Sequence, residues 1–186
     1  NSINTTGPNL TVNLPSSTSS INPGNYGVVF VAANYTLNLT ANDSGIYHFK
    51  SLTLNSSARL VINKTASQHV RVFVDGKILM ESAAKILTTE VSDYGRVLIY
   101  TADSVHLKAF TQVNATVVAP FRGVLIDNAV KINGQILAKK INNTNNGLRG
   151  TLGLYVPFAP PAANAPVAGD ATYSISETGT WSGAHT

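Results

Sequence analysis

The sequence repeats a pattern of short alternating strands at intervals near 20 residues, and this feature constrains the fold most. A run of Val-Val-Ala at 117–119 returns as Ile-Leu-Ala at 136–138, and similar segments begin at Ile46, Val70 and Val97. Within these segments, "LTLN" and "SVHLK" alternate strictly between apolar and polar residues. Such alternation is typical of a strand with one buried face and one face in water.

This repeat predicts a β-solenoid, in which each coil stacks on the previous one and pairs with it in parallel. We therefore predict an all-β fold, a right-handed parallel β-helix of about five to six coils with almost no α-helix and with extended terminal segments. The longer intervals after Ile46 and Val70 are explained by two loops, "TASQH" and "TTEVSDYG", pushed out from one corner.

The register of the repeat predicts aliphatic columns through the core. Each large aliphatic side chain gives roughly 1.5–3 kcal/mol when buried, and only a neighbouring coil can bury it. An isolated coil is therefore not expected to be stable. One predicted column consists of Ile46, Val70, Val97, Val117 and Ile136, and another of Leu54, Leu79, Leu107 and Ile126.

Composition divides the chain into three segments. Residues 1–20 are predicted to be an N-terminal strand and linker, 21–158 the β-helix domain, and 159–186 a Pro/Ala-rich linker with a strand-like C-terminal segment. Both ends alternate like strands, in "NLTVNL" and in "TYSISETGTW". A strand on a linker either folds back on its own stack or pairs with a neighbouring copy. The predicted assembly residues are Leu10, Val12, Leu14, Tyr173, Ile175 and Trp181.

Charge and cysteine content exclude several classes of protein. Only 12% of residues are charged, and the basic residues are scattered from Lys50 to Arg149, so we predict no nucleic-acid partner. The chain has no cysteine and therefore no disulfide or thiolate metal site. No apolar run approaches the ~20 residues of a transmembrane segment. Because the chain begins at Asn1, we expect a mature, processed form or an excised domain.

Acceptor sites for N-glycosylation, Asn-X-Ser/Thr, are unusually frequent. Covalent N-glycans would mark an exposed surface protein, and without cysteine they would point to a prokaryotic cell surface, archaeal or bacterial. The alternative is that Asn and Thr are simply favoured in polar turns and solvent-facing strand positions. The nine sites are Asn4, Asn9, Asn34, Asn38, Asn42, Asn55, Asn63, Asn114 and Asn142.

Residues with catalytic or metal-binding chemistry do not gather in the sequence. Asp75, Asp103 and Asp127 fall near strand ends in different coils, where turn formation explains them better than an acid pair. His48 and His106 lie in alternating stretches and are expected to face solvent, without the spacing of a metal site. We therefore predict no catalytic, cofactor-binding or metal-ligating residues, no cofactor and no enzymatic activity.

Parts of two kinds of binding face are present in the sequence. Thr36, Thr40 and Thr53 start a row that an ice-binding face would need, but "KILM" does not continue it. Four tyrosines could instead form a flat platform for carbohydrate, or they could pack at the coil ends. They are Tyr26, Tyr35, Tyr47 and Tyr100.

The corners of the repeat resemble those of the choice-of-anchor A family of bacterial surface domains. The matching residues are Pro23, Gly24 and Tyr26; Gly45, Tyr47 and Phe49; Ala119 and Pro120; and Asn133, Gly134, Ala138 and Lys139, within about Ile21 to Phe158. The resemblance implies a secreted or surface-attached β-helix with no catalytic residues to carry over. The sequence departs from the family in having no sorting motif or terminal hydrophobic anchor.

These observations predict an extracellular, non-enzymatic structural protein of the cell surface. We expect a self-assembling filament or surface-layer-type subunit joined to copies of itself through its terminal strands. The alternative is a carbohydrate-binding adhesin module of a larger surface protein, with polysaccharide as its partner. An enzyme is the third class and would require an acid pair in one cleft.

Overall fold

A computed structural model describes residues 7–12, 19–41, 45–89 and 94–144, and the backbone of 174–175 and 181–182. The chain forms two units, Asn1–Tyr155 and Val156–Thr186. In the second unit, β16 (Ser174–Ile175) and β17 (Trp181–Ser182) pair in an antiparallel manner. All other described elements belong to the first unit.

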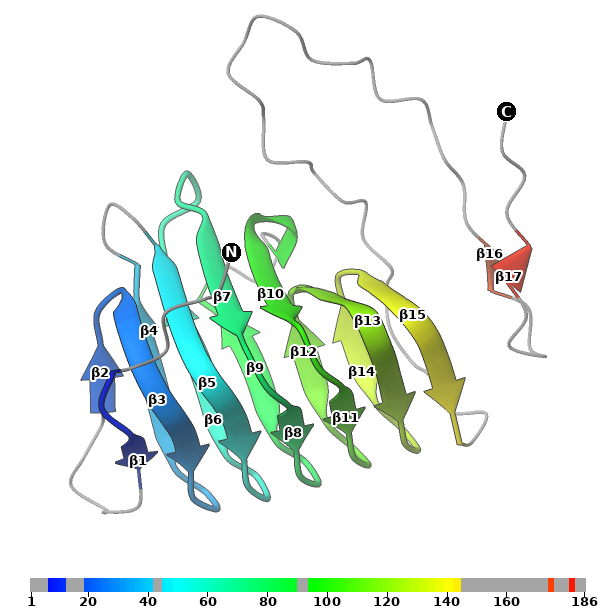
Figure 1. Cartoon of the computed structure of the whole chain (residues 1–186), viewed down its shortest axis with the longest axis horizontal. Helices are drawn as coiled ribbons and strands as arrows, with labels where there is room; N and C mark the ends of the chain where they lie inside the picture. The colour runs from blue at the N-terminus through cyan, green and yellow to red at the C-terminus, as the bar shows by residue number, and fades with distance from the viewer. Residues whose placement is uncertain are drawn as a thin grey trace, which may run out of the picture. The chain divides into compact units, whose positions relative to one another are not determined.

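Two parallel sheets make up the first unit (Figure 1). The larger, which we call sheet A, contains β1 (Leu10–Val12), β3 (Gly24–Val31), β5 (Ile46–Leu54), β7 (Val70–Val74), β8 (Ile78–Met80), β10 (Val97–Thr101), β11 (Val105–Leu107), β13 (Thr116–Ile126) and β15 (Ile136–Asn143). The smaller, sheet B, contains β2 (Ser19–Ile21), β4 (Thr36–Thr40), β6 (Arg59–Asn63), β9 (Lys85–Thr88), β12 (Gln112–Asn114) and β14 (Lys131–Asn133).

The chain runs alternately through the two sheets, so each pass forms one coil of a solenoid. Every pairing between described strands of this unit is parallel, and the coils make about five turns. The only described helix is the short 3-10 turn η1 (Tyr94–Arg96). The prediction of an all-β solenoid is thus confirmed. Within the described ranges, no helix has the length and apolarity needed to cross a membrane.

The core lies between the sheets and is built from columns of aliphatic side chains. Alternation along each strand sends every second side chain inward, and the parallel register stacks it on its equivalent in the next coil. A column on sheet A contains Val31, Leu54, Met80, Leu107 and Ile126. A column on sheet B contains Leu37, Leu60, Ile86, Val113 and Ile132. All ten are at most 3% exposed.

The predicted columns are wrong at three junctions. Leu79 faces outward, and Met80 takes its place against Leu54. Ile46 likewise does not take its predicted place in the core, because the next residue, Tyr47, is the fully buried one.

At the third junction, Val97 stacks on Val70 as predicted, but Val117 stacks on Ile99. The connections from sheet B back to sheet A vary from one residue, after β12, to eight residues, after β9, so the interval between equivalent residues changes from coil to coil. A shift of one residue moves a strand's side chains to the opposite face.

One corner of the solenoid is a stack of residues in the left-handed backbone conformation. In four consecutive coils the N–H of this residue donates to a carbonyl oxygen of the next coil, as from Ser57 to Ser82 and from Ala83 to Ala109. Those bonds satisfy backbone groups that a sharp corner would otherwise leave unpaired. The residues are Asn34, Ser57, Ala83, Phe110 and Ala129, with φ between 55° and 67°.

The opposite corner carries the loops. Residues 64–69 connect β6 to β7, and the longer connection from β9 to β10 includes η1. The two insertions therefore leave one side of the stack, as predicted. At the N-terminal end, β1 and β2 pair with β3 and β4, so the solenoid begins ahead of Ile21.

Candidate functional site

The candidate site is a groove on the outer face of sheet A, where the sheet bends. In three successive coils the strand is interrupted at the same place: between β7 and β8, between β10 and β11, and at the register shift in β13 between Ala119 and Gly123. The strands after the bend stay in register, with Ile78, Val105 and Val124 side by side. Equivalent turns of three coils therefore lie next to one another and form the groove.

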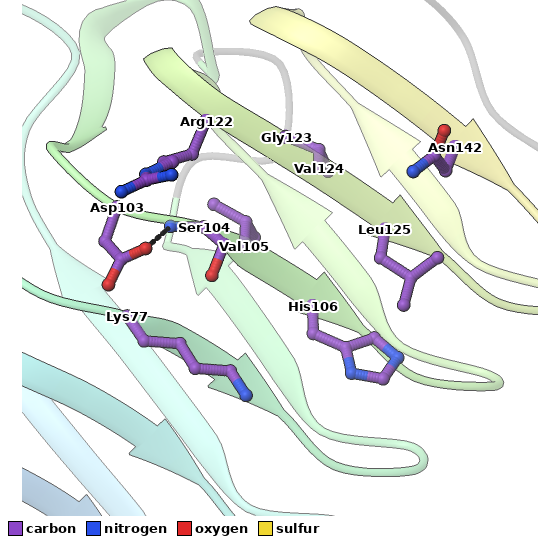
Figure 2. A pocket seen from close by; sticks show the side chains of 10 residues that line it. All are labelled: Lys77, Asp103, Ser104, Val105, His106, Arg122, Gly123, Val124, Leu125 and Asn142. Carbon is purple, nitrogen blue, oxygen red and sulfur yellow. Dashed lines mark hydrogen bonds between the residues drawn. The ribbon is translucent and has the colours of Figure 1, made fainter.

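The groove has a volume of about 430 Å³ and a mixed lining. Figure 2 shows the side chains of Lys77, His106 and Arg122 around it, each carried by a different coil. Lys77 and Arg122 are exposed, and neither side chain forms an ion pair or hydrogen bond with another described residue. Leu125 on β13 and Asn142 on β15 also line the groove. The side chains of two cationic residues thus face the groove without an ion-pair or hydrogen-bond partner among the described residues.

Asp103, the acid in this groove, is engaged in its own turn. Its carboxylate accepts a hydrogen bond of 2.7 Å from the backbone N–H of Ser104 (Figure 2). The hydroxyl of Thr101 donates to the carbonyl of Gly76 at 2.7 Å and accepts from the N–H of Asp103 at 3.1 Å. These bonds hold the bend between β10 and β11. Asp103 therefore has a structural role that turn formation explains.

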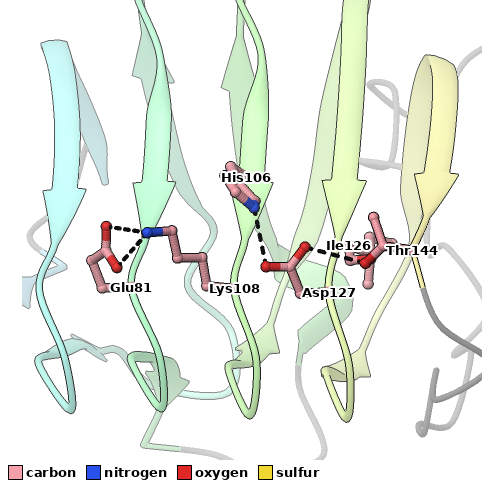
Figure 3. Close-up of polar contacts among 6 residues, drawn as sticks. All are labelled: Glu81, His106, Lys108, Ile126, Asp127 and Thr144. Atoms are coloured by element: carbon pink, nitrogen blue, oxygen red, sulfur yellow. Dashed lines mark hydrogen bonds and ion pairs between the residues drawn. The ribbon is translucent and has the colours of Figure 1, made fainter.

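A polar row follows the ends of the sheet A strands. Lys108 binds both carboxylate oxygens of Glu81 at 2.8 Å. One coil further, Asp127 contacts the His106 ring at 3.3 Å and accepts from the Thr144 hydroxyl at 3.3 Å (Figure 3). The row joins adjacent coils at the corner where the core column ends.

The three aspartates do not share one place. Asp75 and Asp103 lie in equivalent turns of adjacent coils, between β7 and β8 and between β10 and β11, whereas Asp127 follows β13 at the next corner. In the part of the chain that the structure describes, no three His, Asp or Glu side chains gather as a metal ion would require.

The tyrosines do not form a flat platform. Tyr47 is fully buried, and its hydroxyl donates to the Thr40 carbonyl at 2.7 Å; burial raises its pKa above the ordinary value. Tyr26 packs edge-on against Phe49, at 5.9 Å between ring centroids. For these two, packing at the coil end is the better explanation. Tyr35 is partly buried against the core.

Tyr100 belongs instead to an outward row with His48 and Phe73. The rings of His48 and Phe73 stack at 5.2 Å with an interplanar angle of 16°, and Tyr100 follows at 6.0 Å. Because the His48 and Phe73 rings cover one another's faces, they offer mainly their edges to solvent. A sugar ring stacks on an aromatic face, so this row is a poor carbohydrate platform.

His48 makes stability dependent on pH. Burial lowers the pKa of His48 below its ordinary value, and its Nδ1 is buried without a hydrogen-bond partner. The unfolded chain therefore takes up the proton first as pH falls, so stability declines from the unfolded pKa toward the lower folded pKa. We expect His48→Phe to make urea stability flatter between pH 8 and pH 5. If His48→Phe had the same pH profile of urea stability as the unaltered chain, groups other than His48 would cause the pH dependence.

The acceptor asparagines have different surroundings. Asn9, Asn34 and Asn142 are exposed, and Asn38, Asn55 and Asn63 are partly exposed on outward or corner positions. Asn114 is the exception, because it is 3% exposed and its side-chain oxygen accepts from Gln112 and Asn133. A glycan on Asn114 is incompatible with this packing, so we withdraw that site. Asn4 and Asn42 lie outside the described residues.

The predicted assembly residues are partly used within the chain. Leu10 and Val12 lie on β1, which pairs with β3 of the same chain, and Val12 is fully buried. Ile175 and Trp181 are opposite each other in the β16–β17 pair. Leu14 and Tyr173 lie outside the described residues. The N-terminal strand thus folds back in this structure, the alternative that the sequence left open.

Sequence reasoning missed the groove. Its cations, Lys77 and Arg122, follow Asp75-Gly76, which indicates a turn, and Pro120-Phe121, next to a corner that the family resemblance implies. Aligning the turns within coils, and not only the strands, would have placed these residues in adjacent coils.

The fold defines a parallel β-solenoid protein with a groove on the outer face of one of its sheets. The chain belongs to the family described as domain of unknown function (DUF7305), whose family model matches residues 1–151. No match was found among curated proteins or among solved structures. No comparison links the chain to the choice-of-anchor A family, so that resemblance stays a prediction.

Proposed function

We propose that this protein is a non-enzymatic structural subunit of a prokaryotic cell surface, in which solenoids join head to tail through their terminal strands. The observation that carries the proposal is the outer edge of β15, an eight-residue strand that pairs with β13 and with no other described strand. Its side chains Ile136, Ala138 and Ile141 pack against the core. Such an edge is a template for another parallel strand.

The two ends of the solenoid are different, which favours a linear assembly. Contacts between unlike ends repeat in one direction and give open filaments unless a ring closes. The strand nearest the other end is β1, with the sequence Leu-Thr-Val. Adding this end of one copy to β15 of the next would continue sheet A across the boundary.

Charge supports head-to-tail contact over contact between like ends. β15 carries Lys139 and Lys140, both exposed, and such edge lysines oppose pairing of identical edges. The first charged residue in the sequence is Asp43, so the first coils bring no cation to the junction. Two β15 edges would repel each other, whereas β15 and β1 would not.

Surface location is the other part of the proposal, and the glycan acceptors support it. Among described residues, six of the acceptor asparagines are exposed or partly exposed: Asn9, Asn34, Asn38, Asn55, Asn63 and Asn142. A charged fraction of 12% and the lack of cysteine fit a prokaryotic extracellular protein. The adhesin alternative is weakened by the positions of the tyrosines.

A proline at position 138 tests the assembly. The N–H of Val117 donates to the carbonyl of Gln135, and Val117 pairs with Ile136, so alternation turns the N–H of Ala138 away from β13. Proline is tolerated on an edge strand where its missing N–H faces outward. We expect Ala138→Pro to stay folded and to remain monomeric in sedimentation velocity, at concentrations where the unaltered chain forms polymers.

Ala138→Val is the matched control, because it keeps the N–H and should still assemble. A full chain that stays monomeric at high concentration contradicts the proposal. The same holds if Ala138→Pro assembles as well as Ala138→Val.

A further inference from the structure

We propose that the groove on sheet A binds a carboxylate-bearing sugar, as a uronate residue within an acidic polysaccharide. This goes beyond the structural role, since the groove lies on the side of the solenoid and not at its ends. It gives the surface subunit a ligand-binding site that needs no platform of tyrosines.

The charges of the groove favour an anion. Lys77 and Arg122 come from different coils, and neither side chain has a partner among the described residues. Asp103 is already bound by the Ser104 N–H, and the Asp127 carboxylate contacts His106. The carboxylates of Asp103 and Asp127 are therefore engaged, whereas the side chains of Lys77 and Arg122 are not. An unpaired guanidinium is suited to a carboxylate, because its planar fork can donate two parallel hydrogen bonds.

The remaining lining favours a sugar over a simple inorganic anion. Leu125 supplies an apolar surface for the C–H face of a pyranose ring, and Ser104 and Asn142 supply groups that can hydrogen-bond hydroxyls (Figure 2). A volume of about 430 Å³ is within the range of small-molecule sites and holds a sugar ring or two. The groove lies on the outer face of a sheet, so a polymer could pass through it.

The backbone keeps these side chains apart and in place. Asp103, Ser104 and Thr101 fix the bend of the middle coil through hydrogen bonds of 2.7–3.1 Å. Lys77 and Arg122 lie at the equivalent bends of the two coils on either side. A rigid frame lowers the ordering cost of binding.

Titration calorimetry with galacturonate oligomers tests the site directly. The matched ligand is the same oligomer with its carboxylates methyl-esterified, which keeps rings and hydroxyls and removes the charge. We expect the free oligomer to bind at low ionic strength, the ester to bind at least about tenfold more weakly, and added salt to weaken binding. Inorganic phosphate is the third probe and should compete only weakly.

The variants separate a site from general attraction to a basic protein. Arg122→Gln with Lys77→Gln should weaken oligomer binding by about tenfold or more. Arg59→Gln with Lys131→Gln removes the same charge from the exposed outer side of sheet B, and should change binding by less than about twofold.

Equal losses in the two double variants would overturn the proposal. So would equal binding of oligomer and ester, phosphate binding as tightly as the oligomer, or no binding of the oligomer at millimolar concentration. Each of these outcomes leaves the head-to-tail role of β15 untouched, because that role is measured by sedimentation of Ala138→Pro.

Discussion

The Leu54→Asp variant is expected to lose the folded solenoid. Leu54 is fully buried on β5, with Val31 on one side of its column and Met80 on the other. Removing a buried leucine costs about 2–5 kcal/mol, and an unpaired buried carboxylate adds several more. The sum is on the order of 5–10 kcal/mol, comparable to the whole stability of a typical domain. Circular dichroism should show the loss of β structure.

Thr53→Asp is the control for this variant. Thr53 is the preceding residue on the same strand, partly exposed on the outer face, and pairs with Phe30 and Leu79. The same carboxylate there stays in water, so we expect a loss of about 1 kcal/mol or less in urea unfolding. If Leu54→Asp folded as well as Thr53→Asp, the inward and outward faces of β5 would be assigned wrongly.

The second large effect is expected from Gly45→Ala at the start of β5. Gly45 has a φ of 54°, and a Cβ added there would meet the backbone carbonyl oxygen of His69 in the next coil. The carbonyl of Gly45 also accepts from the N–H of Arg71, so the two coils touch at this point. Backbone strain and overpacking together should cost about 2–5 kcal/mol of unfolding free energy.

Gly123→Ala is the matched substitution for Gly45→Ala. Its added Cβ would lie 3.3 Å from the nearest atom, the carbonyl oxygen of Lys140, which is tight but not a collision. We expect a change below about 1 kcal/mol in the same urea titration. Equal effects of the two substitutions would show that the coils at Gly45 can separate at little cost.

The architecture could be predicted because alternation is a local signal. In "LTLN" the inward and outward residues differ in polarity, and in "VRVFV" every second residue is valine; Leu52, Leu54, Val70, Val72 and Val74 are all buried as that alternation requires. The 20-residue period then leaves stacked coils as the arrangement that buries every apolar face. No knowledge of individual contacts is needed for this step.

The register between coils could not be predicted, because it depends on backbone conformations that side-chain pattern does not encode. Ala83 and Phe110 adopt positive φ at the corner, although neither residue type favours it. Their N–H groups bond the neighbouring coil, so tertiary pairing overrides local preference. An alignment that is off by one residue is enough to exchange Leu79 for Met80 in the core.

The groove could not be predicted for a related reason. Lys77 and Arg122 are 45 positions apart in the sequence and have no motif in common. They line the same groove only because the bends of three coils lie in register. The sequon at Asn114 is the opposite case, in which the sequence predicts a surface site that the structure buries. Asn114 is buried because its side-chain oxygen accepts a hydrogen bond from the Asn133 amide of the next coil.

Electron cryomicroscopy of the native assembled protein is the most direct test of the central claim, that these solenoids stack head to tail. We predict filaments with strands perpendicular to the filament axis and a spacing near 4.8 Å along it, continuous through the junction of β15 with the next copy. Filaments whose strands run along the axis, or native material containing only separate single solenoids, would contradict the account.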